Sequence, residues 1–260
     1  MRLRRGLGTA LLLLTLFNPL SWAGTSISKD VSRDTALAKF VKANFEYKDG
    51  HYEAAIKLYE EVLTAGLASG PLYYNLANSY FKKGALGKTI LNYERARRLL
   101  PRDHDLRANQ RYAASLIQNQ VVENPPALGQ RALEQFVEFQ TLDELAMIMF
   151  VLGLLVGATV LLSLHFSWNT SLRNRILIPF SILFLIYSSG FFYQRSHQRD
   201  VAVVIAPTAV KFEPRPEATT YFDLSEGQEI MVLRTEGVWA KIRRGDGKEG
   251  WVEAANIERI

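Results

Sequence analysis

Two long uncharged runs constrain the fold of this chain more than any other feature. Leu145–Leu164 has twenty residues without a charge, and Ile176–Tyr193 has eighteen. About twenty apolar residues is the helix length that crosses the hydrocarbon core of a bilayer. A pair of buried helices in a soluble protein is the alternative, but two such runs with a short connector favour a transmembrane hairpin. We therefore expect membrane-spanning helices over residues 142–166 and 176–193.

The N-terminus has the pattern of a secretory signal. Arg2, Arg4 and Arg5 precede the apolar stretch Leu7–Leu16, and the small residues of Ser21-Trp22-Ala23 follow. A basic start, a short apolar core and a small-residue cleavage site define such a signal. We expect a signal peptide over residues 1–23, with an uncleaved anchor as the alternative.

The exported N-terminus sets the expected topology. The connector Ser167–Arg175 carries Arg173 and Arg175 and no acid, which favours the cytoplasmic side. Arg195 and Arg199 follow the second run, so charge asymmetry alone is a weak guide. Export therefore decides the expectation: a bacterial inner-membrane protein with both soluble parts on the extracytoplasmic, periplasmic side.

A 34-residue echo precedes the apolar runs. Gly50 and Gly84 are 34 residues apart, and the match extends to the pairs Ala43/Ala77, Asn44/Asn78, Ile56/Ile90 and Tyr59/Tyr93. This period and pattern resemble tetratricopeptide repeats, in which each repeat is a helix–turn–helix unit. Unrelated helical hairpins are the alternative. Small residues let the helices approach, and glycine permits the tight turn, so we expect an α-helical tetratricopeptide-repeat domain over residues 34–120.

A capping helix and a linker should follow the second repeat. A third Ala-Asn pair occurs at Ala108-Asn109, but its spacing from the second is 31 residues, and no further Gly-containing hairpin follows. We interpret Asp103–Gln120 as a helix that covers the last repeat, because a terminal repeat cannot bury its own apolar face. The paired prolines at 125 and 126 indicate a linker over residues 121–141.

The first helices of stacked repeats line an inner groove, and this groove is the candidate partner-binding site. Aromatic rings, amides and a lysine could hold an extended peptide or a chain end. The asparagines are also common in such repeats whatever they bind. The expected groove residues are Asn44, Tyr47, Tyr74, Asn75, Asn78, Phe81 and Lys82.

The segment 201–260 has short β-branched strands separated by glycine-rich turns, which is typical of a small β-barrel. The motifs around Trp239 and Gly250-Trp251-Val252 resemble bacterial SH3-type domains. The resemblance implies that Trp251 is a core residue, and that relatives bind peptides or cell-wall peptide. Tyr221, Phe222 and Trp239 are candidates for an aromatic binding surface, with a purely structural tail as the alternative.

Several functions are disfavoured by composition. The chain has no cysteine, which excludes disulfides, thiolate metal sites and a cysteine nucleophile. Its four histidines are scattered, and no phosphate loop or Gly-x-Ser-x-Gly elbow occurs. The formal charge of +5 is modest, and basic residues beside the apolar runs explain it better than nucleic-acid binding does. We expect no catalytic residues, no metal, no cofactor and no enzyme activity.

The order of segments, and above all the stretch 71–114, resembles the BatE proteins of the bacterial aerotolerance (Bat) operons. That resemblance implies protein partners: membrane-anchored von Willebrand factor A proteins and, indirectly, a MoxR-type AAA+ ATPase. The expected function is a membrane-anchored, non-enzymatic scaffold for protein–protein interaction in an aerotolerance or envelope-stress assembly. The alternative is a peptidoglycan-binding protein that recruits a hydrolase or another envelope enzyme.

Overall fold

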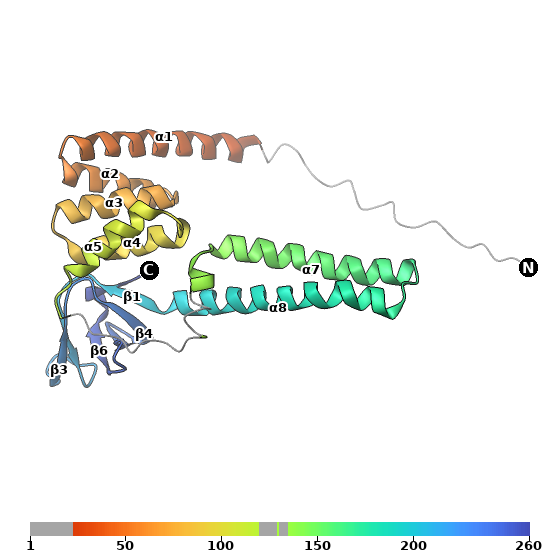
Figure 1. Cartoon of the computed structure of the whole chain (residues 1–260). Coiled ribbons are helices and arrows are strands. Elements are labelled where there is room, and N and C mark those ends of the chain that lie inside the picture. The colour runs from red at the N-terminus through yellow and green to blue at the C-terminus, as the bar shows by residue number, and fades with distance from the viewer. Residues whose placement is uncertain (1–22, 120–128, 130–134) are drawn as a thin grey trace, which may run out of the picture.

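The computed structural model describes residues 23–119, 129 and 135–260. Its N-terminal part is helical, as predicted (Figure 1). The signal peptide and most of the 121–141 linker lie outside the described residues. The five helices of this part stack in chain order and are α1 (Ala23–Lys48), α2 (Tyr52–Thr64), α3 (Gly70–Lys82), α4 (Leu86–Leu99) and α5 (His104–Ser115).

The 34-residue echo corresponds to two helical hairpins, α1–α2 and α3–α4. Gly50 and Gly84 have φ values of +83° and +77°, the left-handed conformation that glycine adopts without strain. Ala43 and Ala77 are fully buried, so nothing larger than a methyl group separates the helices there. Matching residues therefore have matching roles in the two hairpins.

The two uncharged runs form long antiparallel helices, α7 (Leu142–His165) and α8 (Thr170–Arg199). Both are long and apolar enough to cross a membrane, and most of their apolar side chains are exposed. Figure 1 shows the hairpin leaving the rest of the molecule, with both soluble parts at the same end. This arrangement suits a membrane anchor with both soluble parts on one side.

Helix α8 is longer at both ends than the predicted span 176–193. Asn169 caps its start by accepting a hydrogen bond from the Leu172 amide at 2.8 Å. Arg173 and Arg175 consequently lie in the first turns of α8, and the turn between the helices is only residues 166–169. At the other end, α8 reaches Arg199 and a single residue separates it from the first strand.

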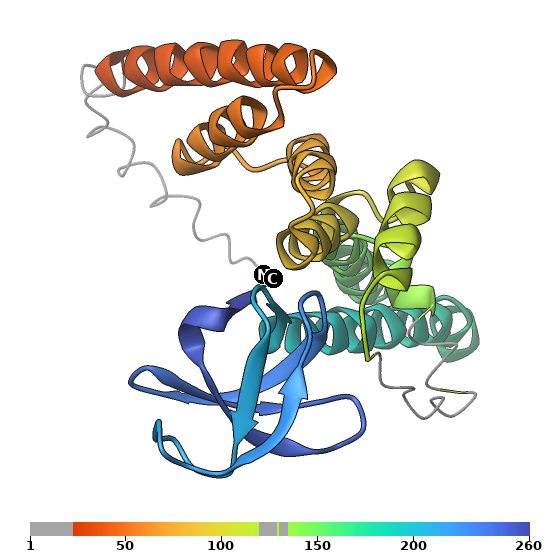
Figure 2. The ribbon, with the colours of Figure 1, turned by 90° about the vertical axis from the view of Figure 1, so that its left-hand side faces the viewer.

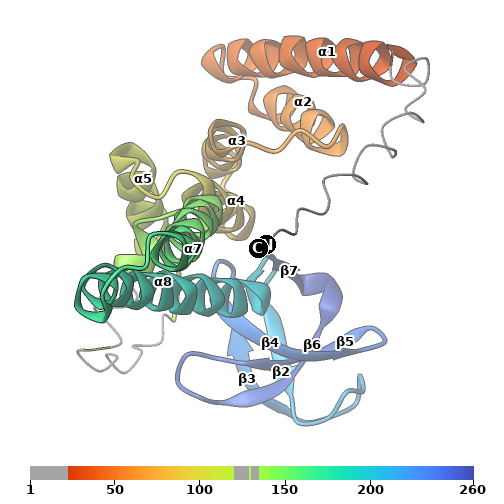
Figure 3. The same cartoon turned by 90° about the vertical axis from the view of Figure 1, so that its right-hand side faces the viewer.

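The C-terminal part is one antiparallel sheet with the order β3-β2-β6-β5-β4-β1-β7 (Figure 3). The apolar stretch after residue 200 is interrupted at Pro207, which cannot donate to a ladder, so it forms two strands. The strands are β1 (Val201–Val204), β2 (Thr208–Lys211), β3 (Thr220–Leu224), β4 (Glu229–Glu236), β5 (Trp239–Arg243), β6 (Glu249–Glu253) and β7 (Ile257–Arg259), with a 3-10 turn at Ala254–Asn256.

The helical part and the sheet share a hydrophobic cluster. Val203, Ile205 and Ile260 of the C-terminal part pack with residues of α3, α4 and α5. Figure 2 shows the sheet directly below the helical stack. The two soluble parts, predicted as separate domains, are thus packed against each other.

The two parts approach closely at Gly87 in the first turn of α4. A β-carbon there would lie 2.5 Å from the Val204 carbonyl oxygen and 2.8 Å from Ile205 Cα. The Gly87 amide donates to Glu226 Oε1 at 2.8 Å. Because Ala85 at the helix start supplies no capping side chain, Glu226 satisfies a helix-terminal N–H from the neighbouring part of the molecule.

Candidate partner-binding groove

The asparagines predicted to line the groove form hydrogen-bonded ladders. In the first hairpin, Asn44 Oδ1 accepts from Tyr59 Oη at 2.6 Å and from Asn75 Nδ2 at 2.9 Å. Tyr59 is fully buried, and burial raises the pKa of its phenol to about 12. The phenol therefore stays a neutral donor, and Asn44 and Asn75 join the two hairpins.

The second hairpin repeats this ladder with α5. Asn78 Oδ1 accepts from Tyr93 Oη at 2.6 Å and from Asn109 Nδ2 at 3.4 Å. Burial also raises the pKa of the Tyr93 phenol. Asn109 thus takes the place of Asn75, 34 residues earlier, and the comparison of Asn109 with Asn78 at a spacing of 31 was wrong. Helix α5 continues the stack in register.

A cavity of about 400 Å³ lies beside the second ladder. Five of the seven predicted groove residues line it; Asn44 and Asn75 do not, because they belong to the first ladder. Three lining residues were missed: Tyr93 was matched to Tyr59 as part of the repeat, whereas Asn109 and Tyr112 lie in the helix whose register was misread. The lining is Tyr47, Tyr74, Asn78, Phe81, Lys82, Tyr93, Asn109 and Tyr112.

The cavity has aromatic walls and one cation. Phe81 and Tyr112 meet edge-on at 5.8 Å between centroids, and among the described residues no acidic side chain lines the space. Lys82 is exposed and makes no ion pair with another described residue. Asn78 Nδ2 likewise has no hydrogen-bond partner in the described part of the chain. Apolar side chains, a carbonyl oxygen and a carboxylate are the groups that this lining can bind.

A second candidate surface lies on the sheet. Phe212 and Tyr221 stack at 4.5 Å, and Tyr221 meets Phe222 at 5.1 Å. Phe212 is 56% exposed and Tyr221 is 41% exposed. Phe212 was missed because it lies just beyond β2, where no side-chain alternation marks it.

Trp239 does not belong to that surface. It is only 7% exposed, at the start of β5, so the prediction that it forms part of an open aromatic shelf was wrong. Trp251 is 6% exposed, as expected of a core residue. Alternation along β5 places Trp239 on the same face as Lys241, whose register partner is Trp251, whereas Ala240 and Ile242 face the core. On this outer face the Lys211 ammonium lies 5.8 Å from the Trp239 ring centroid.

Cations border the aromatic surface. The Arg244 guanidinium lies 4.2 Å from the Phe222 ring centroid and donates to Asp246 Oδ2 at 2.7 Å. The hydrogen bond from Arg244, together with a weaker one from the Lys248 amide, lowers the pKa of Asp246 to about 2. The ion pair holds the guanidinium against the ring, and Lys248 approaches Tyr221.

This strand order, the 3-10 turn and the buried Trp251 agree with the predicted barrel. Residues 208–258 match the family model of the bacterial SH3 domain. No curated protein matches the chain. Strand β1 precedes the matched part of the SH3 domain but pairs with both β4 and β7. A domain of this kind is consistent with binding to proteins or to cell-wall peptidoglycan.

The described residues offer no evident metal site. Within residues 23–119, 129 and 135–260, no group of three or more His, Asp or Glu side chains is placed to hold a metal ion.

Proposed function

We propose that this protein is a membrane-anchored, non-enzymatic scaffold whose tetratricopeptide-type helical part binds a segment of a partner protein. The observation that carries the proposal is the 400 Å³ cavity with aromatic walls and the unpaired Lys82. Aromatic side chains supply contact area, whereas Lys82 and Asn78 fix the orientation of a peptide. The ligand is an extended peptide segment with an apolar residue and a carboxylate.

The SH3 domain and the apolar hairpin support a location of this groove in the cell envelope. Bacterial SH3 domains are typically extracytoplasmic, which supports a periplasmic location for both soluble parts. The partners proposed from the resemblance to BatE proteins are membrane-anchored von Willebrand factor A proteins, with a MoxR-type ATPase acting through them in aerotolerance or envelope stress.

The test uses the full-length chain in its own membrane. A photo-crosslinking amino acid replaces Phe81 in the groove, and the adduct is identified by mass spectrometry. The expected result is one predominant protein adduct that decreases when Lys82→Glu is added. The matched control is Lys57→Glu, an exposed lysine of α2 outside the groove. Equal capture by the two charge variants, or no adduct at all, would contradict the proposal.

Peptidoglycan binding is a second candidate function, because the exposed aromatic surface of the SH3 domain is a separate feature. Rings can stack on sugar faces and on peptide stems. If this function is right, the full chain sediments with insoluble cell wall and Tyr221→Ala reduces that binding. Val238→Ala is the matched control, since Val238 is 71% exposed on the same domain and is not part of the aromatic surface. Binding unaffected by Tyr221→Ala would rule out this surface.

A further inference from the structure

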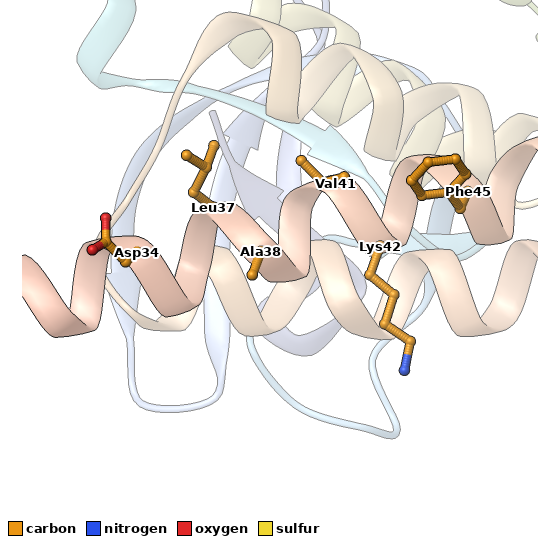
Figure 4. Close-up of a pocket in the computed structure, with 6 residues that line it drawn as sticks. All are labelled: Asp34, Leu37, Ala38, Val41, Lys42 and Phe45. Carbon is orange, nitrogen blue, oxygen red and sulfur yellow. The ribbon is translucent and has the colours of Figure 1, made fainter.

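Helix α1 carries an exposed apolar face that nothing else in the described structure covers. Leu37, Val41 and Phe45 are 60%, 45% and 61% exposed. They lie along a shallow depression of about 560 Å³ on the outer side of the helix, with Ala38 between them (Figure 4). Ala43 on the opposite side of α1 is fully buried. The helix is therefore apolar on two faces, and only one of them has a partner.

The repeat explains why this face is open. Residues 38 and 42 of α1 correspond, 34 residues later, to Leu72 and Leu76 of α3. Both leucines are almost completely buried and pack with residues of α1 and α2. The open face of α1 is thus equivalent to the face by which α3 packs on the hairpin before it. A helical stack requires a cover at such a terminal face.

The charges along this face suit a second copy of the same helix. Five exposed positions, Asp34, Leu37, Val41, Phe45 and Lys48, have spacings of three, four, four and three residues, and the exposed Ala38 and Lys42 flank this row. These positions fall on one side of an α-helix. The spacing is symmetric about Val41, with an apolar residue on each side of it. The two ends differ, because Asp34 is an acid and Lys48 is a base.

We propose that two copies of this chain associate through α1, paired antiparallel around a two-fold axis at Val41. Val41 then meets Val41, and Leu37 meets Phe45 of the second copy. Asp34 and Lys48 of one copy face Lys48 and Asp34 of the other. Neither of these residues forms an ion pair with another described residue in the single chain. Parallel pairing would instead bring like charges together, which is unfavourable.

The position of α1 in the molecule allows this contact between anchored copies. In Figures 1 and 3, α1 is the outermost helix of the stack, the sheet lies at the opposite edge, and the α7–α8 hairpin is displaced from α1. The face therefore points sideways from the anchor. Residues 34–48 span only about 22 Å as a helix, so the contact is smaller than a standard interface. Confinement of both copies to one membrane compensates for weak affinity.

Cysteine cross-linking of the full chain in nanodiscs or native membranes tests the proposal, because the chain has no cysteine of its own. Val41→Cys, on the two-fold axis, should form a disulfide-linked dimer under mild oxidation. Lys57→Cys on the exposed side of α2 is the matched control and should give only the background of random collisions. A mixture of Leu37→Cys chains and Phe45→Cys chains should cross-link more than either alone.

Charge reversal supplies a second readout. Asp34→Lys or Lys48→Asp should each lower the dimer fraction, with a loss of about tenfold in association constant for two broken pairs and their repulsion. The double variant Asp34→Lys/Lys48→Asp should restore it. All of these positions are exposed, so circular dichroism should show unchanged helix content.

Three outcomes would overturn the proposal. Val41→Cys could cross-link no more than Lys57→Cys. It could form an adduct with a different protein, which would show that a partner helix covers the face. The double charge variant could also fail to recover the dimer, which would show that the antiparallel register is wrong.

Discussion

The two ends of the helical stack differ although the same sequence pattern forms both. At one end, the SH3 domain packs on α4 and α5 and places Glu226 at the start of α4. At the other end, α1 exposes Leu37, Val41 and Phe45 to solvent. The ladders of Asn44 and Asn78 are nearly the same, so the hairpins themselves do not differ. The difference is that the SH3 domain, which lies outside the repeat, covers one end of the stack and not the other.

The largest expected effect is the loss of a leucine from the inner face of α3. Leu76 is 2% exposed, so Leu76→Ala should lower the free energy of unfolding by about 2–5 kcal/mol through lost burial and a cavity. Phe45→Ala, on the open face of α1, should change it by less than about 0.5 kcal/mol in the monomer. Denaturant unfolding of the full chain in detergent, followed by circular dichroism, measures both. Similar losses for the two variants would show that α1 is covered.

The next effect concerns the end of the helical stack on which the SH3 domain packs. Gly87→Ala places a β-carbon against the backbone of Val204 and Ile205, so it should cost about 1–3 kcal/mol through overpacking. Limited proteolysis should then cleave near residues 116–119, where the Asn119 carbonyl now accepts from Gln228. Gly157→Ala is the control, because no atom lies within 4 Å of its added carbon. If Gly87→Ala has wild-type stability, the SH3 domain does not pack on α4 as described.

A smaller effect tests whether the two ladders are equivalent. Tyr59→Phe and Tyr93→Phe each remove a buried donor to an asparagine, and each should cost about 1–2 kcal/mol. Tyr112→Phe is the control, since Tyr112 is 61% exposed and should lose little. Chemical unfolding compares the three. A cost at Tyr93 several times that at Tyr59 would mean that the SH3 domain strengthens the ladder next to it.

The smallest effect is the pH dependence of the SH3 domain. Asp246 has a folded pKa of about 2, below the ordinary value of about 3.9. A lowered folded pKa adds stability above pH 4, and this stability is lost as the pH falls towards 2. Between these values, thermal unfolding of the wild type should shift more than that of Asp246→Asn. Parallel curves for the two proteins would show that the Arg244 pair does not persist in solution.

Sequence periodicity predicted the elements that depend on residues close together in the chain. The hairpin turns at Gly50 and Gly84, the uncharged helices and the short strands all follow from patterns within a few tens of residues. The contact between Gly87 and Glu226 joins positions 139 residues apart, and no periodic signal connects them. The covered end of the stack could therefore not be predicted from the repeat.

The candidate binding surfaces were predicted less completely than the fold for a related reason. The asparagines were assigned to ligand binding, whereas their oxygens accept from Tyr59 and Tyr93 inside the protein. Residue type does not reveal which amide atom remains free. Trp239 was placed on the surface by its chemistry, but its position at the start of β5 buries it.

The junction between α8 and β1 has a mechanical consequence. Only Asp200 separates the helix that ends at Arg199 from the strand that begins at Val201, so no flexible tether lets the SH3 domain swing. In the proposed membrane-anchored state, the depth of α8 in the bilayer sets the height of the SH3 domain, and of the groove packed beside it, above the lipid surface. A change in membrane thickness that tilts α8 would then move both candidate binding surfaces together.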